Sequence, residues 1–142
     1  MSITRMVSDI AINCEFAIDK HNFYPDCTLF LIPEGSSELT GFLNSSVSQF
    51  FIRQICPTIR GAYRRFKALY VSQIPIPTAS NTAAITQLVE QILVMKAVNP
   101  GAPVRELERE INERVYALYG LRLDEIRMIE ELTHEERVGG VT

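Results

Sequence analysis

The spacing of apolar residues changes its period near residue 35, and this change limits the chain to a mixed fold. Between residues 8 and 20 the apolar positions alternate, which is typical of a strand with one buried side. These positions are Ile10, Ile12, Cys14, Phe16 and Ile18. A second short apolar run over residues 27–32 is closed by Pro33 and Gly35. We therefore expect the two runs to form an antiparallel pair of strands.

From residue 36 onward the apolar residues follow helical spacing. Ser36 and Ser37 are suited to cap a helix that begins near Glu38, and Pro57 would end it. Its apolar positions are Leu39, Phe42, Leu43, Val47, Phe50, Phe51 and Ile55. Because these positions share one face, we expect the helix to pack on the sheet. Residues 58–77 follow neither period, and they predict a loop that leads into an extended segment ending at Pro75 and Pro77.

Three further helices are expected after residue 80, over residues 81–97, from Pro103 to a stop at Gly120, and over residues 124–136. Their expected buried positions are Ile85, Leu88, Val89, Ile92 and Leu93, then Val104, Leu107, Ile111, Val115 and Leu118, then Ile126, Ile129 and Leu132. The predicted fold class is α+β: a small antiparallel sheet packed against a helix, followed by a helical C-terminal part. Residues 1–79 would be an α/β core and residues 80–142 a helical extension of the same module.

Composition supports a folded protein with no contact to a membrane. Of the 142 residues, 46% are hydrophobic and 22% are charged, which is the balance of a globular domain. The apolar runs are too short to cross a bilayer, and the first residues lack the order of a secretory signal. We therefore expect a cytoplasmic location.

No set of residues suggests a metal site or a catalytic centre. Cys14, Cys27 and Cys56 are widely spaced, and neither His21 nor His134 has a partner at ligand spacing. The sequence also lacks a phosphate-binding loop and a nucleophile beside a base. We expect no catalytic residue, no metal and no enzyme activity from this chain alone.

Charge is distributed unevenly along the chain, whose net charge is −3. Residues 53–70 hold five basic residues and no acid, whereas residues 101–142 hold ten acidic residues against six arginines. The five basic residues are Arg53, Arg60, Arg64, Arg65 and Lys67. In the acidic part, Glu and Arg interleave over residues 105–114, which is typical of a solvated helix face with i,i+4 pairs. We expect this acidic face to point away from any polyanionic ligand or toward a protein partner, and the basic segment to form one charged surface.

Alternation within the basic segment would place its side chains on two opposite sides. If residues 63–67 are extended, Tyr63, Arg65 and Lys67 lie on one side, and Arg64 and Phe66 lie on the other. Both sides cannot face the same ligand, so some of these basic residues must be structural. An alternative interpretation is a solvated face whose aromatic residues are buried in the core.

Five stretches occur in an order that resembles a known family. They are residues 24–32 (YPDCTLFLI), residues 41–45 (GFLNS) with their continuation 50–53 (FFIR), residues 60–67 (RGAYRRFK), residues 70–77 (YVSQIPIP) and residues 110–121 (EINERVYALYGL). Together they resemble the TaqI-like C-terminal specificity domain, which ends adenine-specific methyltransferases and single-chain restriction–modification enzymes. The resemblance runs from about residue 9 to residue 132. It departs from the family at Ala62, where many relatives carry a second glycine.

The resemblance implies a target-recognition module that binds double-stranded DNA. Arg and Lys side chains neutralise phosphates and donate to guanine in the major groove. The candidate DNA-binding residues are Arg60, Tyr63, Arg64, Arg65, Lys67 and Gln73. Structural roles are expected for Arg53, which would cap the carbonyl end of its own helix, and for Asn44 and Ser45, which would bond to the following loop. Gln73 could contact adenine, but a hydrogen bond to the protein backbone is the safer expectation for it.

The chain lacks the motifs that the methyltransferase reaction requires. No Asn/Asp-Pro-Pro-aromatic motif and no glycine-rich loop for S-adenosylmethionine are present, and Asn99-Pro100-Gly101 lacks the second proline and the aromatic residue. S-adenosylmethionine is therefore expected only in the parent enzyme, with its methyltransferase domain as a partner. The alternative function is a protein-interaction module that docks on such a domain or forms a homodimer.

Overall fold

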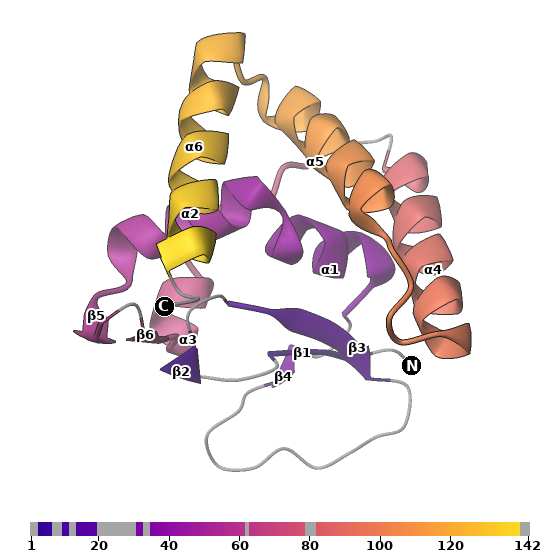
Figure 1. Cartoon of the computed structure of the whole chain (residues 1–142), viewed down its shortest axis with the longest axis horizontal. Coiled ribbons are helices and arrows are strands. Elements are labelled where there is room, and N and C mark those ends of the chain that lie inside the picture. The colour runs from indigo at the N-terminus through magenta and orange to yellow at the C-terminus, as the bar shows by residue number, and fades with distance from the viewer. Residues whose placement is uncertain are drawn as a thin grey trace.

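The computed structural model of the chain describes residues 3–6, 10–11, 14–19, 31–32, 35–61, 63–78 and 82–139. The helices lie above two small sheets, which occupy the lower side of Figure 1. The elements are β1 (Ile3–Met6), β2 (Ile10–Ala11), β3 (Phe16–Asp19), β4 (Leu31–Ile32), α1 (Ser37–Asn44), α2 (Ser46–Ile55), β5 (Thr58–Arg60), β6 (Tyr63–Arg65), α3 (Ala68–Val71), α4 (Ala83–Val98), α5 (Arg105–Tyr119) and α6 (Leu123–Gly139). The α+β class predicted from the sequence is confirmed.

The strands form two antiparallel sheets, ordered β3-β1-β4 and β2-β6-β5. The prediction of one strand over residues 8–20 is wrong, because β2 and β3 belong to different sheets. Between them the side-chain amide of Gln49 accepts from the Cys14 N–H and donates to the Cys14 carbonyl, so that this backbone bonds to α2. The expected pairing of β3 with β4 is also wrong, because β1 lies between them. Residues 20–30 lie outside the described part of the chain.

The helix expected near residues 38–56 is interrupted at Ser45, which is extended (φ −65°, ψ 158°) and separates α1 from α2. Its hydroxyl donates to the Phe42 carbonyl at 2.6 Å and accepts from the Ser48 N–H, so one side chain serves both helix ends. The predicted cap at Ser36 is confirmed, because its hydroxyl accepts from the Leu39 N–H at 3.0 Å. The interruption lets α1 pack on α4 and β3 while α2 packs on α5 and α6.

The core consists of two hydrophobic clusters, and both receive side chains from α1 and α2. The first, beneath the hairpin formed by β5 and β6, contains Cys14, Phe16, Leu43, Ile52, Cys56, Phe66, Val71 and Ile74. The second joins α1 and α2 to the C-terminal helices through Phe42, Val47, Ile85, Leu88, Val89, Ile111, Val115, Tyr116 and Ile129. Because one helix pair serves both clusters, the strands and the C-terminal helices are packed into one structure.

The three C-terminal helices follow the sequence prediction closely, with one wrong buried position. Leu132 is 43% exposed, and Thr133 is buried in its place, because Thr133 rather than Leu132 lies one turn after the buried Ile129. None of the helices described is long and apolar enough to cross a membrane. Where α1 approaches α4, a Cβ at Gly41 would lie 3.0 Å from the side chains of Ile85 and Val89, so glycine permits this contact.

Gly120 ends α5 in the left-handed region (φ 67°), and a Cβ built there meets no atom within 4 Å. We expect Gly120→Ala to lower the free energy of unfolding by about 1 kcal/mol through backbone strain alone. Gly101→Ala is the matched control, because Gly101 lies outside this region and its Cβ would only reach Asn99 Oδ1 at 3.5 Å. Urea denaturation of both variants measures the difference, and equal losses would contradict this account.

Candidate nucleic-acid interface

The basic segment forms a β-hairpin rather than the expected loop. Strand β5 pairs with β6, Gly61 turns the chain with φ 58°, and β2 continues the sheet on the other side of β6. Figure 1 places this sheet and α3 at one end of the molecule. The extended segment predicted from the sequence is confirmed over Tyr63–Arg65, whereas α3 was not predicted. Ala62 lies outside the described residues, so the departure from the family pattern at this position stays open.

The predicted alternation of side chains in the hairpin is confirmed. Phe66 is 1% exposed, and Arg64 is half-buried beside it. On the opposite side Tyr63 is 51% exposed, and Arg65 and Lys67 are exposed as well. Arg60 at the end of β5 is also exposed. The hairpin therefore presents three exposed cations and one exposed aromatic ring over eight residues.

Arg64 bonds to the carbonyl end of α2, where helix carbonyls lack partners of their own. Its Nη1 donates to the Arg53 carbonyl at 3.1 Å and to the Cys56 carbonyl at 2.6 Å. The prediction that Arg53 caps this helix end is wrong. Arg53 is buried, and its Nη1 lies 3.5 Å from the Thr133 carbonyl of α6. Helical side chains lean toward the N-terminus, so Arg53 points away from the carbonyls that it was expected to cap.

A buried thiol supports the hairpin from below. Cys56 follows α2, is 1% exposed and donates through Sγ to the Arg65 carbonyl at 3.1 Å. Burial raises the pKa of this thiol, and the positive charges of Arg64 and Lys67 oppose the shift. At neutral pH the thiol is protonated and retains the hydrogen that this bond requires.

Burial also raises the pKa of the Cys14 thiol, from 9.0 to about 12, with smaller contributions from Cys56 and Glu15. The folded chain therefore holds this proton more tightly than the unfolded chain, which releases it near pH 9. We expect the free energy of unfolding to be unaffected by this group below pH 9 and to fall as the pH rises from 9 toward 12. Cys14→Ala should remove that part of the decline. Urea titrations at several pH values measure it, and an unchanged decline in the variant would contradict the assignment.

Two polar residues near the expected interface form hydrogen bonds with the protein's own backbone. Gln73 is exposed, and its Nε2 donates to the Leu69 carbonyl at 3.0 Å, which is the backbone bond that we expected as the alternative. Asn44 accepts from the Phe16 N–H at 2.8 Å and donates to the Phe16 carbonyl at 2.9 Å. The expected bond from Asn44 to the following loop is thus wrong, because its amide joins the end of α1 to β3.

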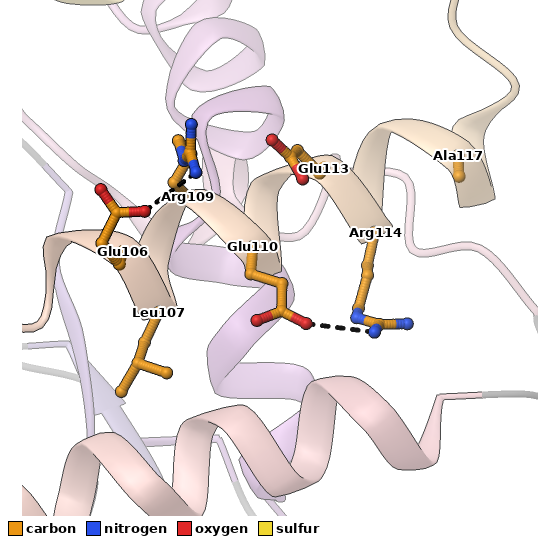
Figure 2. A pocket seen from close by; sticks show the side chains of 7 residues that line it. All are labelled: Glu106, Leu107, Arg109, Glu110, Glu113, Arg114 and Ala117. Carbon is orange, nitrogen blue, oxygen red and sulfur yellow. Dashed lines mark hydrogen bonds and ion pairs between the residues drawn. The ribbon is translucent and has the colours of Figure 1, made fainter.

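Helix α5 lies apart from the hairpin, with α2 and α6 between them in Figure 1. Arg114 pairs with Glu110 at 3.1 Å at the predicted i,i+4 spacing, and Arg109 pairs with Glu106 at 2.9 Å at i,i+3 spacing. A surface depression of about 460 Å³ lies along this face, and all of its lining residues come from α5 (Figure 2). In the described part of the chain, no three His, Cys, Asp or Glu side chains could hold a metal ion.

The sequence alone misjudged the role of Arg53, and it placed Arg64 among the candidate DNA-binding residues although it held a signal that Arg64 points inward. Arg64 shares its side of the extended segment with Phe66, and that position indicated an inward direction. No comparable signal marked Arg53, because its contact on α6 lies 80 residues away along the chain. The exposed Ile59 and Leu69, which are 56% and 66% exposed, were also not singled out.

Comparison with known proteins places these features in a family. Residues 4–76 match the model of the TaqI-like C-terminal specificity domain, a region that includes the hairpin and α3. The chain is also 28% identical over 119 residues to the type II methyltransferase M.XhoI of Xanthomonas vasicola. That similarity covers 82% of this chain and 20% of the relative, so the chain spans about a fifth of its relative's length. Because the family model matches half of its residues, the chain belongs to the TaqI-like C-terminal specificity domains.

Proposed function

We propose that this chain is the DNA target-recognition module of an adenine-specific DNA methyltransferase or restriction–modification enzyme. The observation that carries the proposal is the hairpin of β5 and β6, on which Arg60, Tyr63, Arg65 and Lys67 are exposed together. A two-stranded ribbon fits the major groove of B-DNA, and Arg and Lys side chains bind phosphates or guanine there. Gln73, exposed after α3, is a further candidate contact with a base.

The relative that this chain resembles is a methyltransferase, and four fifths of its length lie outside the matched region. We propose that S-adenosylmethionine binding and methyl transfer belong to that other part of a parent enzyme. The module described here would select the DNA site and supply no group to the reaction. Its second partner would be the methyltransferase domain.

A specific observation also favours docking on a protein as a second function. The C-terminal half of α4 exposes Val94, Met95 and Val98, which are 64%, 37% and 85% exposed. Apolar side chains that are exposed together on one helix are typical of a surface that another protein covers. Docking through these residues would respond weakly to salt, whereas contacts with phosphates weaken steeply as the salt concentration rises. The two functions are therefore separable by their salt dependence.

The proposed DNA contact is tested by neutralising the three exposed cations of the hairpin together. Fluorescence anisotropy of a labelled duplex of mixed sequence would follow binding between about 50 and 200 mM salt. We expect the Arg60→Gln, Arg65→Gln and Lys67→Gln variant to bind at least about tenfold more weakly. The slope of log affinity against log salt should fall by up to about 2.7, since each phosphate contact contributes about 0.9.

The matched control carries the same change of charge on α5: Arg105→Gln, Arg109→Gln and Arg114→Gln. This variant should bind DNA as the unmodified chain does, because α5 lies apart from the hairpin (Figure 1). Equal weakening in both variants would show a general effect of net charge. Undiminished binding by the hairpin variant would reject this surface as the DNA contact.

A further inference from the structure

We propose that Arg64 is a positioning residue that anchors the recognition hairpin to the end of α2 and does not contact DNA. This inference rests on the DNA-binding function proposed above, and it removes one cation from the candidate contacts. The structural basis is that Arg64 is the basic residue of the hairpin that points into the molecule, whereas Arg60, Arg65 and Lys67 are exposed.

The anchor is a single guanidinium nitrogen that donates hydrogen bonds to two backbone carbonyls. Nη1 of Arg64 lies 3.1 Å from the Arg53 oxygen and 2.6 Å from the Cys56 oxygen. Carbonyls at the C-terminal end of a helix carry a partial negative charge, which favours a cation at this position. A charge-assisted bond of this kind is stronger than a bond between neutral groups. A phosphate contact would require Arg64 to leave both carbonyls and expose a half-buried stem.

The backbone next to Arg64 is held from the same helix end. The Cys56 thiol donates to the Arg65 carbonyl at 3.1 Å, and Arg64 is paired with Thr58 in the sheet. Neighbouring side chains of a strand point to opposite faces. Because Arg64 is fixed inward, Tyr63 and Arg65 are fixed outward. The ribbon is thus ordered before it meets DNA. The entropy cost of ordering it therefore does not reduce the free energy of binding.

Salt titration separates a positioning residue from a residue that binds phosphate. We expect Arg64→Met to weaken duplex binding by about tenfold at every salt concentration while the slope of log affinity against log salt stays the same. The neighbouring substitution Arg65→Met should lower that slope by about 0.9. Arg64→Lys keeps the charge on a shorter side chain, and it should leave the slope unchanged as Arg64→Met does. A reduced slope in Arg64→Met that Arg64→Lys restores would overturn the proposal.

A second measurement needs no DNA and keeps the two proposals distinguishable. Chymotrypsin cleaves after Tyr63 and Phe66, and both sites remain in all of these variants. On the folded full chain, checked by circular dichroism, we expect cleavage in the hairpin to be several times faster for Arg64→Met than for Arg65→Met, which carries the same added methionine. Equal cleavage rates would overturn the anchor. Absence of DNA binding by the unmodified chain, together with faster cleavage of Arg64→Met, would reject the proposed function and leave the anchor standing.

Discussion

A chain that ends at residue 79 is expected not to fold, although it contains the whole region that matches the family model. The helices after residue 80 cover Phe42 and Val47, which are 0% and 9% exposed in the full chain. Burying one such side chain stabilises a protein by about 1.5–3 kcal/mol. Removal of three helices takes away most of the second cluster, and the total stability of a domain is only about 5–15 kcal/mol.

Circular dichroism and urea denaturation of the shortened chain test this expectation. A chain ending at residue 139 is the matched control, because it loses only residues beyond α6 and keeps both clusters. The control should unfold in one cooperative transition like the full chain. A cooperative transition of the chain that ends at residue 79 would show that residues 1–79 are an independent domain.

Phe42→Ala is expected to be the most damaging single substitution, with a loss of about 3–5 kcal/mol in the free energy of unfolding. Phe42 is 0% exposed in the second cluster, where α1 packs against α4. Shortening it leaves a cavity that the surrounding helices fill only in part. Val98→Ala is the control, since Val98 is 85% exposed and should change stability by less than about 0.5 kcal/mol. Comparable losses in the two variants would contradict the described core.

The sequence predicted those parts of the fold that depend on local spacing. The C-terminal helices were found because apolar residues recur at every turn and Gly120 marks an end by its own backbone preference. The division of the hairpin side chains, with Tyr63 and Arg65 on one side and Arg64 on the other, was found for the same reason, since alternation in a strand is a local property. Local patterns of this kind do not depend on which distant segment lies nearby.

Several of the wrong predictions involve side chains that bond across the fold. The break at Ser45 is stabilised by Asn112, whose side chain accepts from the Ser46 N–H at 2.9 Å over 66 residues of sequence. The strand near Cys14 is interrupted because Gln49 takes its backbone bonds. The contacts of Arg53 with α6 and of Arg64 with the end of α2 arise only where these elements meet. Apart from the inward direction of Arg64, none of these contacts has a periodic signature in the sequence.

Positive charge is concentrated on the hairpin, whereas the chain as a whole carries a net charge of −3. In the field of a polyanion, such an uneven distribution favours the orientation in which the positive surface leads. The net charge of −3 acts in the opposite sense, because it repels the molecule as a whole. If the chain binds DNA as proposed, its approach is favoured with the hairpin leading, within about one Debye length, roughly 8 Å at physiological salt. The same charge that weakens general attraction thus selects the orientation in which an encounter can succeed.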